Sequence, residues 1–168
     1  MTNDDSRLAV LFLCTGNSAR SILAEAILNE RGGDRFRAFS AGSHPTGEVN
    51  PGALAELRRR GHPDRAYRSK SWDEFAAPAA PLFRLVFTVC DSAAGESCPL
   101  WPGHPLTVHW GIPDPAAITE PEDAVRDAFR IAYDRLAGRI DGLVALPVET
   151  ASDDEIQVAL SELHAAGG

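Results

Sequence analysis

The chain has 168 residues, 44% of them hydrophobic and 24% charged, a composition that fits one globular domain and excludes a chain disordered throughout. Its formal net charge of −8 argues against nucleic acid as the main partner. No apolar run approaches the roughly 18 residues that cross a bilayer, and residues 1–7 are too polar for a signal peptide. We therefore expect a cytoplasmic protein without a membrane partner, in which three cysteines indicate thiol chemistry sooner than structural disulfides.

The first half of the chain predicts two strands, each followed by a helix. Residues 8–13 are continuously apolar, which is the pattern of a parallel strand covered on both faces, and a second short strand is expected at 36–40. The helix after the first strand should end at Gly32, and the helix after the second should begin at Asn50, with a proline in its first turn. The arginines at 58–60 are expected on a solvated face of that second helix.

The second half continues the alternation of strands and helices. The elements predicted there are a short capped helix at 69–75, strands at 82–89 and 106–110, a long helix opened by a capping box at 119–122, and a last helix from Ser152 to about His164. Such alternation indicates right-handed βαβ units. The expected fold is α/β, a single domain with a four-stranded parallel sheet flanked by helices on both faces. We assign residues 1–145 to this domain and 146–168 to a short C-terminal helical extension, an appendage without chemistry of its own.

A cysteine, a loop of small residues and an arginine follow the first strand. The small residues at 15–19 leave backbone N–H groups free to converge on an oxyanion, and the start of the next helix strengthens such a site. Arg20 adds a planar fork that matches two oxygens of a tetrahedral anion. Beside a helix N-terminus and a cation the pKa of Cys14 should fall, which favours the nucleophilic thiolate. The alternative is a buried, inert cysteine at a strand end.

This order of residues, reading Cys-Thr-Gly-Asn-Ser and then Ala-Arg-Ser, resembles the phosphate loop of the low-molecular-weight tyrosine phosphatases and of the arsenate reductases built on that fold. The likeness extends over roughly residues 8–143. The residues that it implies in oxyanion binding are Thr15, Gly16, Asn17, Ser18, Ala19 and Arg20. It also implies that Ser21 stabilises the Cys14 thiolate, that Asn17 holds the backbone of the loop, and that Ser40 hydrogen-bonds toward Asn17.

Asp114 is the candidate general acid, because displacement at a tetrahedral centre needs a proton for the departing oxygen. It stands in an Asp-Pro pair after a predicted strand. By itself such a pair is more often a turn, but the family presents its acid in this way. Asp91 is the weaker competitor, since it adjoins Cys90.

The segments around these candidate residues resemble those of the arsenate reductases of the family. Its phosphatases follow the acid with aromatic residues, whereas here two alanines follow the Asp-Pro pair. The segments that end in Cys90 and Cys98 resemble the arsenate reductases. This resemblance implies a relay in which Cys14 attacks arsenate and Cys90 then attacks Cys14, so that arsenite leaves. Cys98 next attacks Cys90, and an external thiol opens the Cys90–Cys98 disulfide.

The resemblance leaves the electron donor open. Cys98 follows Cys90 by one residue more than in the thioredoxin-coupled relatives, so the donor is thioredoxin, or glutathione with glutaredoxin. Phosphate is the expected competitor of arsenate. Some relatives bind potassium near Asn17; Glu25 and Ser40 match that set, but two serines (Ser69 and Ser71) stand where threonine and aspartate are expected, which weakens the match. We expect no cofactor and no zinc, because the histidines do not pair with the cysteines at metal-ligand spacings.

Three functions are consistent with these residues, and they differ in which residues they need. An arsenate reductase should need all three cysteines, Cys14, Cys90 and Cys98. A low-molecular-weight tyrosine phosphatase, acting through a phosphorylated Cys14, should need Arg20 and Asp114 but neither of the later cysteines. A non-catalytic oxyanion sensor or arsenic-binding protein should bind without turnover.

Overall fold

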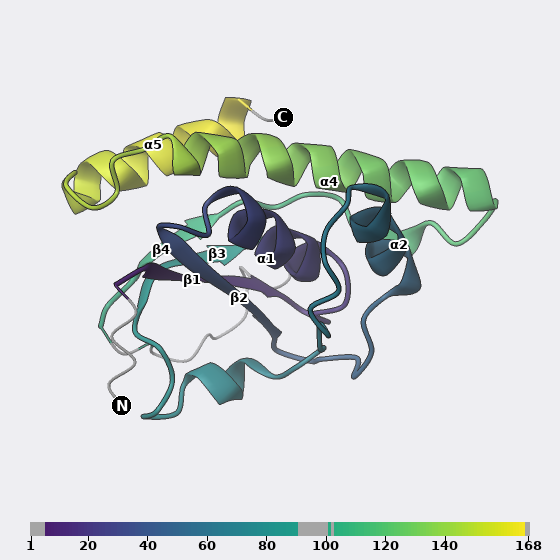
Figure 1. Cartoon of the computed structure of the whole chain (residues 1–168), viewed down its shortest axis with the longest axis horizontal. Helices are drawn as coiled ribbons and strands as arrows, with labels where there is room; N and C mark the ends of the chain where they lie inside the picture. Colours follow the sequence, from purple (N-terminus) through teal and green to yellow (C-terminus); the bar gives the residue numbers. More distant parts are fainter. Residues whose placement is uncertain (1–5, 91–100, 102, 167–168) are drawn as a thin grey trace.

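The computed structural model describes residues 6–90, 101 and 103–166. Four strands form one sheet in the order β2-β1-β3-β4, and every neighbouring pair is parallel (Figure 1). The strands are β1 (Leu8–Cys14), β2 (Phe36–Gly42), β3 (Phe83–Thr88) and β4 (Leu106–His109). The expected four-stranded parallel sheet is thus confirmed, and the carboxyl ends of its strands meet at one edge.

The helices follow the strands in the expected order. They are α1 (Arg20–Arg31), α2 (Pro51–Arg59), the 3₁₀ helices η1 (Trp72–Phe75) and η2 (Pro115–Ala117), α4 (Glu122–Val144) and α5 (Asp153–Ala166). The predicted start of α2 is confirmed, because Asn50 Oδ1 accepts a hydrogen bond from the backbone N–H of Gly52 at 2.8 Å.

The capping box expected at 119–122 is wrong. The N-cap of α4 is Pro121, and no side chain hydrogen-bonds this end of the helix. Thr119 precedes the N-cap by two residues, so its hydroxyl is not at the position from which a capping box closes. Glu122 and Asp123 in the first turn supply the charge that a helix N-terminus favours.

The two faces of the sheet are covered unequally. On one face α1 lies between the sheet and α4 (Figure 1), over a core in which Phe87 stacks on Phe12 with ring centroids 5.2 Å apart. On the other face, the helix among the described residues is the single-turn η1, whose Phe75 packs on Phe39 and Phe83 at 5.6 Å. Helices therefore cover both faces as expected, but the second cover is thin.

The C-terminal segment is not the appendage that we expected. Ile156 and Leu160 of α5 are buried in the main core, and Asp153 pairs with Arg84 of β3 at 2.7 Å. The indole N–H of Trp110 donates to the carbonyl oxygen of Leu160 at 2.9 Å, in the interior. The helix that the sequence predicts is present, and it belongs to the packing around β4.

Candidate active site

The loop after β1 is held from outside by its carbonyl groups. The carbonyl oxygens of Thr15, Gly16 and Ser18 accept backbone N–H bonds from residues 44, 46 and 50, at 2.9, 3.0 and 2.9 Å. The Ser69 hydroxyl donates a further bond to Gly16 O at 2.9 Å. Because these carbonyls are bound by neighbouring segments, they point away from the side on which we expect the loop N–H groups to bind an oxyanion. This is the arrangement that an oxyanion requires.

Asn17 fixes the turn inside the loop. Its φ of 45° lies in the left-handed region, which asparagine tolerates better than most residues, and its side chain is fully buried. The amide oxygen accepts the backbone N–H of Lys70 at 2.9 Å, while the amide nitrogen donates to Ser21 Oγ at 2.8 Å. The role expected for Ser40 is wrong in its partner, because its hydroxyl donates to Glu25 at 2.6 Å instead of pointing to Asn17.

Gly42, at the end of β2, lets the loop approach the sheet. A Cβ atom at this position would lie 2.5 Å from Thr15 O and 2.9 Å from Cys14 O. Both are backbone atoms, so a side chain here would displace the loop itself. The glycine that ends β2 is therefore a requirement of the loop packed against it.

Cys14 lies at the base of the loop, and its sulfur is 2.9 Å from the Ser21 hydroxyl. We expected a lowered pKa from the sequence, and this is wrong for the structure described here. Burial raises the pKa of the Cys14 thiol, while hydrogen bonds from the side chain and backbone of Ser21 lower it, and Arg20 adds a smaller effect in the same direction. The buried sulfur sits away from water, and desolvation of the thiolate outweighs the donors around it.

Ser21→Ala should therefore raise the pKa of Cys14 still further, since it removes a hydrogen bond that stabilises the thiolate. Less thiolate is then present at pH 7, and alkylation of Cys14 by iodoacetamide should slow by about tenfold or more. Rates measured against pH in a Cys90→Ser background give the pKa directly. Ser18→Ala is the matched control in the same loop. An unchanged pH profile in Ser21→Ala would contradict this role of the hydroxyl.

The structure brings Arg20 and Asp114 together. Arg20 opens α1, and one guanidinium nitrogen donates to the carbonyl of Ile112 at 3.1 Å. A second nitrogen is 3.6 Å from Asp114 Oδ2. Asp114 also caps η2 through the N–H of Ala116 at 3.0 Å, and its side chain is 43% exposed. A fork for oxyanion oxygens and a carboxyl group thus stand side by side at the carboxyl edge of the sheet.

Cys90 is the second cysteine that the structure places at this edge. It follows β3 and is buried, and its sulfur accepts the backbone N–H of Thr15 at 3.3 Å. Thr15 directly follows Cys14, so the two thiols belong to the same small region. No disulfide joins Cys14 and Cys90. Cys98 and Asp91 lie outside the described residues, and the roles expected for them stay predictions.

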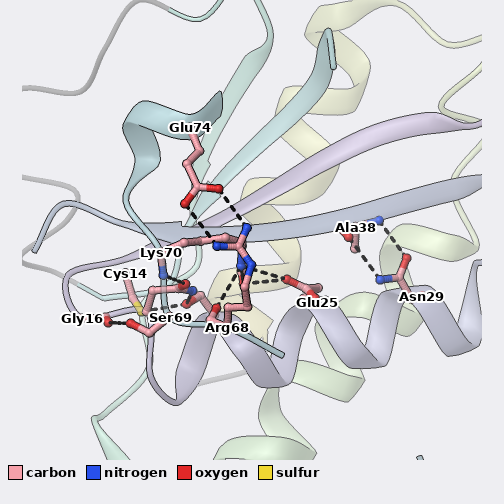
Figure 2. Close-up of polar contacts among 12 residues, drawn as sticks. Cys14, Gly16, Glu25, Asn29, Ala38, Arg68, Ser69, Lys70 and Glu74 are labelled. Atoms are coloured by element: carbon pink, nitrogen blue, oxygen red, sulfur yellow. Dashed lines mark hydrogen bonds and ion pairs between the residues drawn. The ribbon is translucent and has the colours of Figure 1, made fainter. Parts of the chain in front are cut away.

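Behind the loop, Lys70 supplies a cation that the sequence did not point out. Its ammonium group is 3.9 Å from Glu25 Oε1, 3.5 Å from Ser40 Oγ and 3.0 Å from Arg68 O; Figure 2 shows it directed toward Glu25. Burial lowers the pKa of Lys70 and raises the pKa of Glu25, and the charge of each partner opposes that shift. The Lys70 ammonium group therefore lies beside Glu25 and Ser40, the two residues that match potassium ligands of some relatives.

Lys70→Met should lower the free energy of unfolding by about 1–3 kcal/mol, because it leaves the buried Glu25 carboxylate without its cation. The double variant with Glu25→Gln should recover part of this loss. Urea denaturation measures both. Arg68→Met is the matched control, since the pair of Arg68 with Glu74 is exposed and should contribute less than about 1 kcal/mol. Equal losses in Lys70→Met and Arg68→Met would contradict a special role for the buried pair.

Beside Asp114 the surface is hollowed on the side of α4. The hollow measures about 480 Å³. It is lined by Pro113, Asp114, Pro115, Ala117, Ile118, Ala128, Ile131, Ala132 and Arg135. Its walls are aliphatic, and Ile118 and Ile131 are each 43% exposed.

Two absences hold for the described part of the chain. Over 6–90, 101 and 103–166, no three His, Cys, Asp or Glu side chains gather in a way that could hold a metal ion. Within the same residues, no helix has the length and apolar character needed to span a membrane.

Comparison with known proteins identifies the family of the chain. Residues 9–154 match the family model described as low molecular weight phosphotyrosine protein phosphatase. An arsenate reductase of Bacillus licheniformis is 35% identical over 135 residues, which are 80% of this chain and 94% of the relative. The crystal structure of an arsenate reductase from Archaeoglobus fulgidus matches with a TM-score of 0.58 and 28% identity, over 79% of this chain and 98% of that one.

A thioredoxin-dependent arsenate reductase of Corynebacterium glutamicum matches with a TM-score of 0.60 and 25% identity, and the match covers 93% of this chain and 65% of that one. The matched family region contains the loop after β1, Arg20, Cys90 and Asp114. By sequence, by fold and by the extent of the match, the chain belongs to the low molecular weight phosphotyrosine protein phosphatase family.

Proposed function

We propose that the protein reduces arsenate to arsenite, with Cys14 as nucleophile and Cys90 as the thiol that resolves the adduct. The observation that carries the proposal is the position of Cys90, whose sulfur accepts the N–H of Thr15 at 3.3 Å beside the nucleophile. A simple phosphatase needs no second thiol there. The names of the relatives support the same reading, since curated proteins about 35% identical are arsenate reductases.

In the first step Cys14 passes its proton to the bound arsenate dianion, and its sulfur attacks arsenic. A sulfur–arsenic bond forms and an arsenic–oxygen bond breaks, while Asp114 protonates the oxygen so that it leaves as water. Loop N–H groups and Arg20 neutralise the oxyanion as charge shifts onto it. Transfer of the thiol proton to the substrate fits a sulfur whose pKa is raised by burial.

In the second step the Cys90 thiolate attacks the sulfur of Cys14. A disulfide forms, the sulfur–arsenic bond breaks, and its electron pair reduces arsenic from the +5 to the +3 state, so arsenite leaves. The Thr15 N–H is placed to stabilise the Cys90 thiolate. Cys98 then attacks Cys90 and releases the Cys14 thiol. The donor, thioredoxin or glutathione with glutaredoxin, supplies two electrons and two protons to the Cys90–Cys98 disulfide. Since such donors are maintained in the cytoplasm, we propose a cytoplasmic reaction.

Phosphotyrosine hydrolysis is the second candidate, and the hollow beside Asp114 is the observation that favours it. An aliphatic wall next to the general acid suits an aromatic leaving group. The reaction would use Cys14, Arg20 and Asp114 in the same way, but the phosphorylated Cys14 would be released by water. Cys90 would then take no part.

The deciding experiment compares arsenate reduction by the purified protein with a thioredoxin system and with a glutathione and glutaredoxin system, side by side. Arsenite formation with one of them, coupled to NADPH oxidation, is the expected result. Hydrolysis of phosphotyrosine that exceeds arsenate turnover by orders of magnitude would instead favour the phosphatase. Arsenate binding by the fully reduced protein without turnover in either system would indicate a sensor.

A further inference from the structure

We propose that Arg139 of α4 is a positioning residue for Asp114, and that it acts on the segment 110–114 that joins β4 to this carboxylate. The proposal rests on the proposed function, because the place of Asp114 matters only where a departing oxygen needs its proton. Arg139 does not touch the oxyanion loop in the structure. Its effect passes through the backbone that carries the acid.

Arg139 binds the first two residues of the segment. One guanidinium nitrogen donates to the carbonyl oxygen of Trp110 at 2.9 Å and to that of Gly111 at 3.2 Å. The side chain is almost fully buried, at 4% exposure. Two consecutive carbonyls, only a few residues before Asp114, are thereby tied to the C-terminal third of α4.

A buried guanidinium is costly, and this one has poor compensation. Its Nε has no hydrogen-bond partner among the described residues, and burial together with the nearby charge of Arg135 lowers the pKa of Arg139. An aliphatic side chain of similar length would fill the same space without that penalty. Unlike an aliphatic side chain, the arginine forms hydrogen bonds to the carbonyl oxygens of Trp110 and Gly111.

Other contacts fix the same segment from its remaining sides. Trp110 is fully buried, its ring lies 4.1 Å from that of Phe87, and its indole N–H reaches Leu160 of α5 at 2.9 Å. Ile112 O accepts Arg20 at 3.1 Å. Asp114 itself is exposed at 43%. Its position is therefore set mainly by the backbone before it. The N–H groups of Trp110 and Ile112 donate to Thr88 O and Val89 O at 2.7 and 3.2 Å, and Arg139 holds the same stretch through the carbonyl groups of residues 110 and 111.

Arg139→Met tests the inference, because methionine keeps most of the volume and removes the donors. The substrates are aryl phosphates whose phenols range from nitrophenols, which leave without a proton, to unsubstituted phenol, which leaves poorly. A displaced acid should lower kcat about tenfold or more for phenyl phosphate, less than about threefold for the nitrophenyl esters, and change KM little. Arg139→Lys should lie between. Arg130→Met, on the exposed face of α4, is the matched control.

An equal loss for all leaving groups, or no loss in a folded variant, would overturn the inference. Asp114→Asn, measured in parallel, separates it from the proposed function: if this variant shows the leaving-group dependence of the wild type, the acid itself is misassigned. If the kcat of Asp114→Asn depends steeply on the leaving group and that of Arg139→Met follows the wild type, only the role of Arg139 is lost. Should Arg139→Met fail to fold, Arg139→Lys, which keeps one donor group, must show the same leaving-group dependence to a smaller degree for the inference to stand.

Discussion

Cys14→Ser is expected to abolish arsenate reduction and aryl phosphate hydrolysis together, each by at least about 10³-fold. The serine oxygen would occupy the place of the sulfur beside Ser21, where the distance is now 2.9 Å. A hydroxyl is far less acidic than a thiol, and a buried one without a base beside it attacks neither arsenic nor phosphorus. Steady-state assays of both reactions measure the loss.

Binding separates this prediction from simple damage to the loop. The carbonyls of Thr15, Gly16 and Ser18 are held from outside and not by Cys14, so Cys14→Ser should bind phosphate within about threefold of the wild type in calorimetry. Arg20→Lys provides the comparison, because it keeps the charge and loses the planar fork, and phosphate affinity should fall. Residual turnover of either substrate above about 1% in Cys14→Ser would show that another group is the nucleophile.

Cys90→Ser should impair arsenate reduction but not aryl phosphate hydrolysis. Arsenate turnover is expected to fall by at least about 10²-fold, since the serine hydroxyl does not form the disulfide that expels arsenite. Aryl phosphate hydrolysis should stay within about threefold of the wild type, because water resolves a phosphorylated cysteine without a second thiol. The substitution changes one buried atom beside the Thr15 N–H, and thermal unfolding checks that the fold is kept.

A single turnover without any donor sharpens this test. The wild type and Cys98→Ser should each release arsenite from fully reduced protein, because formation of the Cys14–Cys90 disulfide suffices. Cys90→Ser should release none. If Cys90→Ser turned over arsenate with glutathione at the rate of the wild type, glutathione itself would be the resolving thiol and the relay would be wrong.

Local patterns made much of this structure predictable. The continuous apolar run before Cys14 predicted β1, and Asn50 with its following proline predicted the start of α2, because strand burial and helix caps depend on residues close in sequence. The candidate site was also foreseeable where it is local: the loop after β1 and Arg20 adjoin each other in the chain. Parallel topology then brings Cys90 and Asp114 to the same edge.

What the sequence did not reveal depends on distant segments. Lys70 falls within the short helix predicted at 69–75, and nothing in that pattern indicates its partner. Its contact with Glu25 arises because the chain before η1 packs against α1. From the sequence, Arg139 is expected on the polar face of an amphipathic helix, whereas in the structure it is buried. The raised pKa of Cys14 has the same origin, because the sequence shows the donors around the sulfur but not how completely the fold removes it from water.

The outward bracing of the loop carbonyls has a consequence for selectivity. Residues 44, 46, 50 and 69 hold the loop after β1 in place without any bound anion. The loop should therefore offer the same donors to every tetrahedral oxyanion of similar size. Arsenate and phosphate should then be admitted almost alike. If the proposed relay operates, we expect the two anions to be distinguished after they bind, because attack by the Cys90 thiol reduces arsenic but not phosphorus.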